Sequence, residues 1–448
     1  MPKYLRRRGT RQTRLNDLHM AMADVTATDI APSPGDARPR VLFVNTRSTL
    51  GADVAVHLTL VEHLNPDAVD VYVATNRHSA DLDKTVGWIR KAPQAQLLVC
   101  DLGHELTGGN RVTKALSVVR NLPAFFTLLR LIRFIRRERI TILHTTDRPR
   151  DAAFTTLLGK LTGASVVLHL HLKWTSDIGR AAHWAARHAR AFIGISKFTC
   201  QSMVDGGLPA ERIAMVYNAS DTTRFNPETV HGGTLRSRLG IDDRVPLVGL
   251  VGRFTVWKGH LDLVTAFARV REMIPAARLV LVGRLSDDDM EGEDSYVSKI
   301  KRRISDLGLT DAVHWVEWAS DTPGVMKDLD VLAMPSWEEP FGLVVTEAMA
   351  MERPVVAYAS GALPEIITDG VDGLLVPPRD TEALALALVS LLRDPERRTA
   401  MGKRGRQRVV TDFGPQRQAD EVAALYRVVA RDSEPPRPTG ISALAPTN

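Results

Sequence analysis

Cysteines and long apolar runs are both scarce in this sequence. Its 448 residues include two cysteines, Cys100 and Cys200, too few for a disulfide framework and typical of a reducing cytoplasm. No uncharged apolar run reaches the ~18 residues of a membrane span, and the N-terminal segment lacks the apolar core of a secretory signal. With 44% apolar residues and 6% aromatic residues, we expect a globular, cytoplasmic protein of two or three domains.

The excess of positive charge is concentrated at the N-terminus. The formal net charge is +6, and residues 1–40 hold eight basic minus four acidic residues, or +4, which leaves +2 for the rest. This segment is rich in Arg and then in Pro, Ser and Ala, and it has too little apolar surface to order itself. We predict a disordered basic tail over residues 1–38 and a body that binds no nucleic acid. A tail that binds membrane or nucleic acid is the alternative.

Two series of short apolar runs give the domain organisation. The first contains RVLFVNT, VDVYVAT, ITILHTT and SVVLHLHL, and the second begins at PLVGLVG, after a break at Asn218–Arg244. Amphipathic stretches follow the runs, as in βαβ units. We predict an α/β protein with two doubly wound parallel-sheet domains, residues 39–230 and 231–432, followed by a disordered tail over residues 433–448. Ligands bind such domains at the carboxyl ends of the strands.

The stretch SWEEPFGLVVTEAMA carries two acids eight positions apart. Pro340 disfavours the helical region for Glu339 and suits the first turn of a helix, so Glu339 is expected on a loop and Glu347 on the helix. At ~1.5 Å per residue their axial separation is roughly 8–12 Å, against the ~5 Å of a retaining hydrolase pair. The acids therefore suit opposite ends of one long ligand, with a phosphate-binding helix N-terminus between them. Two solvated acids on a surface helix are the alternative.

The stretch VGRFTVWKG places Arg253 and Lys258 at a turn from strand to helix. Two cations above a helix N-terminus can hold a diphosphate. Structural ion pairing is the alternative. No G-x-G-x-x-G or G-x-x-x-x-G-K-[ST] pattern follows a strand, which argues against dinucleotide and P-loop sites.

These two stretches, followed in order by AYASGALPEIITDGVDGLLVPPRD, resemble glycosyltransferase family four, a large retaining group with the GT-B fold. The resemblance covers roughly residues 39–430 and is closer in the second half. It implies two Rossmann-like domains with an interdomain cleft, the first for the acceptor and the second for the donor. The implied activity is that of a retaining hexosyltransferase, which moves a sugar from a UDP- or GDP-linked donor to a hydroxyl in glycan, polysaccharide or glycolipid biosynthesis.

Site residues carry over from the resemblance where the motifs match. Arg253 and Lys258 would bind the diphosphate, Glu339 the sugar hydroxyls, Glu347 the ribose, and the backbone between these acids would face sugar and phosphate. The implied donor-binding residues are Gly51, Arg253, Lys258, Glu339, Phe341, Gly342, Leu343, Glu347, Gly361, Pro364 and Glu365. The implied catalytic residues are His171, Arg253, Lys258 and Glu339. In SGALPEI the family's more usual Gly-Gly pair is not present.

The first half matches the family more loosely. STLGADVAV resembles the glycine loop G-G-x-E, with Leu50 in place of the first glycine, Gly51 as the remaining one and Asp53 as the acid. HLHL resembles the strand with the active-site histidine and selects His171. Because side chains two apart on a strand share a face, His169 and His171 are alternatively a metal-binding pair. No set of Cys, Asp or Glu with metal-ligand spacing lies nearby in the sequence, and a packed, hydrogen-bonded histidine is the third interpretation.

No cofactor beyond the donor is expected, and no metal. The acidic run SDDDMEGED, residues 286–294, is similar to the D-x-D that binds a cation in the other glycosyltransferase fold. Because Arg253 and Lys258 would already neutralise the leaving diphosphate, a metal is not needed there. We interpret the acidic run as a solvated loop.

The stretch AFFTLLRLIRFIRRERI predicts a helix with two faces. Its expected core stripe is Phe125, Leu128, Leu129, Ile132 and Ile135. Its other face carries Phe126, Arg130, Arg133 and Arg137, either as a solvated surface or as a contact to anionic lipid at the inner face of the membrane.

The expected partners are a nucleotide sugar and a sugar, lipid-linked or small-molecule acceptor. A GT-B-like sugar-nucleotide epimerase and a non-catalytic nucleotide-sugar binder are the alternative functions.

Overall fold

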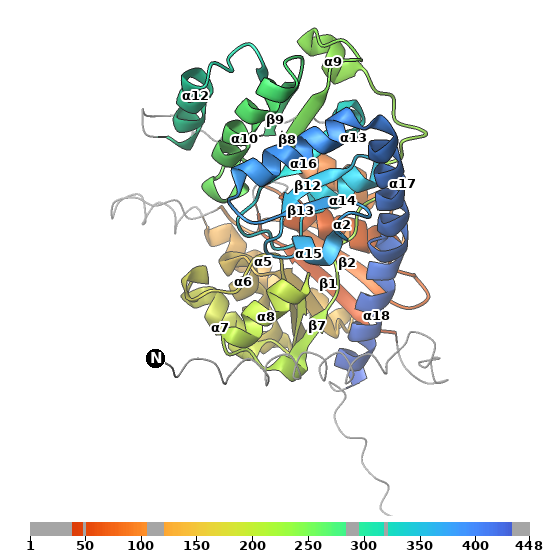
Figure 1. The fold of residues 1–448 in the computed structure, drawn as a ribbon. Helices are drawn as coiled ribbons and strands as arrows, with labels where there is room; N and C mark the ends of the chain where they lie inside the picture. Colours follow the sequence, from red (N-terminus) through yellow and green to blue (C-terminus); the bar gives the residue numbers. More distant parts are fainter. Residues whose placement is uncertain (1–37, 48–50, 105–120, 284–294, 318–320, 432–448) are drawn as a thin grey trace, which may run out of the picture.

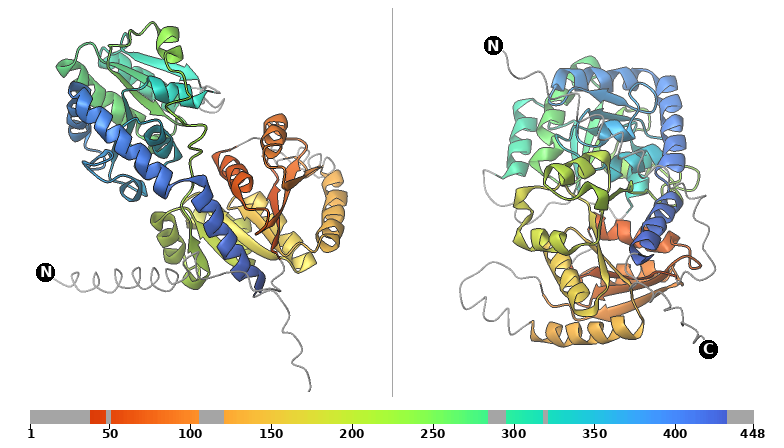
Figure 2. Two further views of the ribbon diagram at one scale, coloured as in Figure 1. Left: turned by 90° about the vertical axis from the view of Figure 1, so that its right-hand side faces the viewer. Right: turned by 90° about the horizontal axis from the view of Figure 1, so that it is seen from below.

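The computed structural model describes residues 38–47, 51–104, 121–283, 295–317 and 321–431. Two parallel sheets, each flanked by helices, form two domains (Figures 1 and 2). The predicted tails, the acidic run at 286–294 and Leu50 lie outside the described residues. Within the described residues, no helix combines the length and apolarity needed to cross a membrane.

The first domain is built on a seven-stranded parallel sheet with the order β3-β2-β1-β4-β5-β6-β7. The strands are β1 (Arg40–Asn45), β2 (Asp70–Asn76), β3 (Ala95–Cys100), β4 (Ile142–Thr146), β5 (Ser165–Leu170), β6 (Ala191–Gly194) and β7 (Ile213–Met215). The strand order reverses between β1 and β4. In a doubly wound sheet such a reversal opens a ligand site at the carboxyl ends of the strands.

Helices cover both faces of this sheet, so the residues of its central strands are buried on both faces. The helices are α2 (Ala52–His63), α3 (Leu82–Ile89), α5 (Leu122–Arg137), α6 (Pro149–Thr162), α7 (Arg180–His188) and α8 (Lys197–Asp205). The core on one face includes residues of α2 and α3, and the core on the other face includes residues of α5, α6, α7 and α8.

The second domain has a six-stranded parallel sheet with the order β10-β9-β8-β11-β12-β13. Its strands are β8 (Leu247–Val251), β9 (Arg278–Gly283), β10 (Val313–Glu317), β11 (Val331–Met334), β12 (Val355–Tyr358) and β13 (Leu374–Val376). Its helices are α9 (Thr234–Leu239), α10 (His260–Met273), α12 (Tyr296–Asp306), α13 (Thr322–Asp328), α14 (Leu343–Ala350), α15 (Leu363–Ile366), α16 (Thr381–Arg393) and α17 (Pro395–Asp412). The predicted fold class of two doubly wound α/β domains is confirmed.

The last helix, α18 (Pro415–Arg431), returns to the first domain (Figure 2, left). Its residues Ala419, Val422 and Tyr426 are buried in the same core as α2 and the central strands of the first sheet. The predicted second domain, residues 231–432, included this helix. The apolar face of α18 instead covers the sheet of the first domain, beside α2. The chain therefore crosses between the domains a second time after α17.

Helix α5 is rotated relative to the predicted stripe. Its most buried side chains are Thr127, Leu131 and Ile135, spaced four residues apart on one face. Phe125 is 57% exposed and Leu129 is 37% exposed, so their assignment to the core is wrong. The sequence did not indicate this buried face, because Thr127 is polar and because apolar residues occur around most of the helix.

Candidate active site

A buried ion pair lies at the carboxyl ends of β8 and β11. Lys258 Nζ is 2.6 Å from Glu339 Oε2, and both residues are less than one-tenth exposed. The turn after Lys258 makes this approach possible: Gly259 has φ +72°, and a Cβ there would lie 2.0 Å from the backbone oxygen of Pro335. Because only glycine fits so close to the neighbouring backbone, Gly259 lets the turn before α10 pack against the loop before α14.

This pair unites two of the residues that the sequence analysis assigned to the donor. An ammonium has three donors and a carboxylate two oxygens, so each partner keeps capacity for a ligand. The structural ion pairing considered as an alternative for Lys258 is therefore present, and it is compatible with binding. Arg253 follows β8 on the same turn and is exposed, outside the pair.

The turn that opens α14 carries the next three predicted residues. Gly342 caps the helix with φ +102°, and no described side chain caps it, so its first N–H groups are available to an anion. Phe341 is buried against the rings of Tyr217 and Phe413. The fixed phenyl ring anchors the backbone that leads into Leu343, the first residue of α14.

Glu347 has surroundings unlike those of Glu339. It lies half-buried on α14. Burial raises the pKa of its carboxyl to about 7, although the Arg224 guanidinium acts in the opposite direction. Its carboxyl therefore changes ionisation close to neutral pH, where that of an ordinary glutamate is fully ionised.

The loop with Gly361, Pro364 and Glu365 supports the Glu339 loop and reaches the other domain. Gly361 has φ +57°, and a Cβ there would lie 2.3 Å from the backbone oxygen of Glu339. Glu365 accepts hydrogen bonds from the N–H groups of Lys197 and Phe198 at the start of α8, at 2.7 and 2.8 Å. Glu365 thus caps a helix of the first domain, while Pro364 is exposed in α15.

Two further contacts bring the Glu339 loop against the first domain. Lys173 Nζ lies 2.8 Å from Glu338 Oε2. Ser196 Oγ donates a hydrogen bond of 2.7 Å to the backbone oxygen of Pro340. The residues flanking Glu339 therefore touch the segments that follow β5 and β6, so the carboxyl ends of both sheets meet here.

His171 lies at this edge, directly after β5. Asp147 Oδ2 accepts hydrogen bonds from the backbone N–H groups of His171 and Leu172, at 3.2 and 3.1 Å. Burial lowers the pKa of the His171 imidazole to about 4, the nearby Asp53 opposing this shift and Arg148 adding to it. The ring is therefore neutral at physiological pH, able to donate from one nitrogen and accept at the other.

The glycine loop of the first domain is described from Gly51 onward. Gly51 is the N-cap of α2. Asp53 accepts hydrogen bonds at 3.0 Å from Arg47 and Arg148. Burial alone would raise the pKa of Asp53, but the nearby His171, Arg47 and Arg148 lower it. The acid thus holds two cations beside His171.

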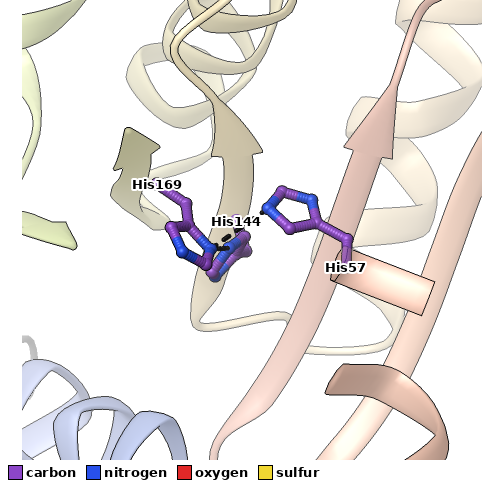
Figure 3. A group of neighbouring side chains, drawn as sticks. All are labelled: His57, His144 and His169. Atoms are coloured by element: carbon purple, nitrogen blue, oxygen red, sulfur yellow. Dashed lines mark hydrogen bonds between the residues drawn. The ribbon is translucent and has the colours of Figure 1, made fainter. Parts of the chain in front are cut away.

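Beneath His171 lie His57, His144 and His169, which we call the histidine cluster (Figure 3). One nitrogen of each ring lies within 4.8 Å of the other two. Of these, only His169 was considered from the sequence, as the alternative metal-binding partner of His171; His57 and His144 were not predicted, because they come from other elements far along the chain. The available signal was a histidine inside the apolar run ITILHTT, which needs a buried partner.

Two models of known protein families match this chain. The family model described as Glycosyltransferase Family 4 matches residues 54–224, and the model described as Glycosyl transferases group 1 matches residues 233–408. The two matches fall on the first and second sheets respectively. The chain belongs to glycosyltransferase family 4. The predicted family and enzyme class are thereby confirmed.

Several relatives of this family 4 glycosyltransferase are known. Alpha-D-kanosaminyltransferase from Streptomyces kanamyceticus is 29% identical, over 67% of this chain and 81% of its own. A GDP-mannose-dependent alpha-(1-6)-phosphatidylinositol monomannoside mannosyltransferase from Mycolicibacterium smegmatis is 32% identical over 47% of this chain and 55% of its own, so the match spans about half of that relative. The structure of Anabaena HepE in complex with UDP has a TM-score of 0.68 and 20% identity, over 86% of this chain and 99% of that chain. The structural likeness confirms the GT-B fold.

Proposed function

We propose that this glycosyltransferase moves a hexose from a UDP- or GDP-linked donor to an acceptor hydroxyl, with retention of the anomeric configuration. The observation that carries the proposal is the buried Lys258–Glu339 pair, held at the edge where the two sheets meet. A sugar nucleotide has a diphosphate beside a polyhydroxylated ring, and the pair offers a cation and a carboxylate side by side. The named relative from M. smegmatis uses GDP-mannose, and HepE binds UDP and UDP-glucose.

Each donor-side group has a role in this proposal. Lys258 and the exposed Arg253 stabilise the diphosphate as it departs, because negative charge grows on it in the transition state. Glu339 orients the sugar hydroxyls with the carboxylate oxygen that Lys258 leaves free. The N-terminus of α14 faces phosphate, and Glu347 accepts the ribose hydroxyls.

The acceptor side belongs to the first domain. Asp147 fixes the backbone of His171, and the His171 ring nitrogen Nε2 lies 3.3 Å from His57 Nε2, so the ring is oriented before any ligand arrives. The proposed acceptors are a sugar, a lipid-linked saccharide or a small molecule, in glycan, polysaccharide or glycolipid biosynthesis.

No divalent cation is required at the diphosphate in this proposal, because Lys258 and Arg253 supply the positive charge. Desalted protein should transfer sugar at the same rate with and without added Mg²⁺ or Mn²⁺. A saturable, several-fold stimulation by either ion would contradict this.

We also propose that α5 touches an anionic membrane surface. Phe125 and Phe126 are 57% and 62% exposed, and Arg130 and Arg133 are exposed on the same helix. Exposed aromatic rings beside cations suit the interface of an anionic bilayer. The test is co-sedimentation with anionic and neutral vesicles: binding should need anionic lipid and be lost in Phe126→Ser with Arg130→Gln. Equal binding to both vesicle types would contradict it.

The transfer proposal is tested with a panel of UDP- and GDP-sugars. A donor at one hundred times its Kd should stabilise the protein by ~2.7 kcal/mol in a thermal shift. The stabilising donor should then yield a glycosylated product with an added acceptor. Conversion of the donor without an acceptor would support an epimerase, and binding without any turnover would support a non-catalytic binder.

A further inference from the structure

Three histidines from three elements converge inside the first domain. The register of β4 and β5 pairs His144 with Val167 and Thr146 with His169, so the two histidines lie diagonally on one face of the sheet. Helix α2 covers this face and brings His57 down onto them (Figure 3). His57 is 8% exposed and the other two are fully buried.

The nitrogens face one another at distances that suit metal coordination. His169 Nδ1 lies 3.2 Å from His57 Nε2 and 3.2 Å from His144 Nε2. Two nitrogens bound to a tetrahedral zinc at ~2.0–2.1 Å are separated by about 3.3 Å. Two of the nitrogen–nitrogen distances in the cluster therefore already match those between ligands of a tetrahedral zinc ion.

Hydrogen bonding alone uses these nitrogens poorly. Each ring nitrogen has either one proton or one lone pair. His169 Nδ1 faces two nitrogens, so two donors must share its lone pair or two acceptors must share its proton. His57 Nε2 has the same difficulty, because it also faces His171 Nε2 at 3.3 Å. A metal ion removes the conflict, since it takes one lone pair from every ring.

We infer that His57 Nε2, His144 Nε2 and His169 Nδ1 form a binding site for a divalent transition metal, with zinc as the best match. Neutral imidazoles suit zinc, copper and nickel, whereas magnesium and calcium prefer oxygen ligands. The site is separate from the proposed diphosphate site, whose cations are in the second domain. It therefore stands whether or not the proposed transfer reaction is correct.

One neighbour of the cluster, Tyr426, fits this assignment. Tyr426 Oη lies 2.6 Å from His144 Nδ1. With Nε2 on the metal, Nδ1 carries the proton and donates it to the phenolic oxygen, which fixes the ring as metal-bound histidines require. His171 Nε2 lies 3.3 Å from His57 Nε2, beside the proposed site.

The metal would tie together α2, β4 and β5, and through Tyr426 also α18. These elements lie far apart in the sequence, and His57 and His169 both contact the ring of His171. The proposed role of the metal is thus structural: it stabilises the residues beneath His171 and does not exchange with solvent during turnover.

The first test uses the unaltered full chain, prepared without a polyhistidine tag. Elemental analysis by mass spectrometry should find about one equivalent of zinc per chain. Chain loaded with Co²⁺ instead should show the visible absorption bands of a four-coordinate nitrogen site. Sub-stoichiometric zinc, with no cobalt bands and no rise in melting temperature on adding zinc, would overturn the proposal.

The second test replaces the ligands one at a time. In His57→Gln, His144→Gln and His169→Gln the zinc content should fall at least about tenfold, whereas Tyr426→Phe should weaken zinc affinity about tenfold. His63→Gln is the matched control, because His63 lies on α2 and bonds to the backbone oxygen of Thr59; it should keep its zinc. If the ligand variants misfold, the cobalt spectrum of the unaltered chain still shows whether the metal site exists. Full zinc retention in folded ligand variants would contradict the assignment.

Discussion

The two domains hold their functional groups in different ways. On the donor side, Lys258 and Glu339 form a charged pair at 2.6 Å, built from two turns that glycines allow to touch. On the acceptor side, four histidines lie in contact: His57 on α2, His144 on β4, His169 on β5 and His171 directly after β5. Burial lowers the pKa of each imidazole. In the proposed function, the first arrangement stabilises the charge of a leaving diphosphate, and the second holds uncharged imidazole rings in fixed positions. The difference explains why disrupting charge should matter most in the second domain.

The largest effects should come from the cations. Lys258→Ala and Arg253→Ala should each lower kcat by roughly 10²–10³, the scale for deleting one preorganised charge-stabilising group. Lys258→Ala should also reduce the free energy of unfolding by about 3–5 kcal/mol, because it leaves Glu339 buried and unpaired. Arg253 is exposed and serves as the matched control for stability. Steady-state kinetics and thermal melts measure both, and effects confined to KM would contradict the transition-state role.

The two acids should separate binding from turnover. Glu339→Gln should mainly lower kcat, since misplacing the reacting carbon by ~1 Å costs ~10²-fold. Glu347→Gln should mainly weaken donor binding, by roughly 1.5–3 kcal/mol for charge-assisted hydrogen bonds. Calorimetry and turnover assays on both variants test this division. Equal kinetic defects in the two would refute it.

A smaller effect is expected from pH at Glu347. Its pKa of about 7 lies above the value in an unfolded chain. The stability that this group contributes is therefore greatest at low pH and is lost as pH rises through about 7. Donor affinity should change in the opposite direction, increasing as the carboxylate ionises. Binding and melting curves should show both trends, and Glu347→Gln should remove them; a donor affinity that falls on ionisation would contradict the ribose assignment.

The smallest effect should come from the bridge between the domains. Lys173 and Glu338 are both more than one-third exposed, so solvent screens their attraction. Lys173→Ala should change the free energy of unfolding by less than about 1 kcal/mol, as for other exposed ion pairs. A loss of several kcal/mol in a denaturant titration would show that this contact holds the domains together.

The proposed donor residues could be named from the sequence because they lie in three short contiguous motifs, whereas the contact between Lys258 and Glu339 was not predicted. Pro340 and Gly342 fix the loop and helix around the acids, and the strand pattern before Arg253 is regular. The histidine cluster was not predictable, because His57 is 112 residues from His169 and only the packing of α2 on the sheet brings them together. The position of α18 was missed for a similar reason: the sequence indicates its apolar face but not the sheet that this face covers, and only the folded chain shows that it packs in the core of the first domain.

The stereochemistry of transfer tests the central claim most directly. Proton NMR of the product formed from an α-linked nucleotide sugar reports the anomeric configuration of the new glycosidic bond. The account predicts that the α configuration is retained and that no glycosyl-enzyme accumulates on Glu339, because Glu347 lies eight positions further along the chain, too distant for the ~5 Å carboxylate pair of a retaining hydrolase. A β-linked product, or a sugar trapped covalently on Glu339, would contradict it.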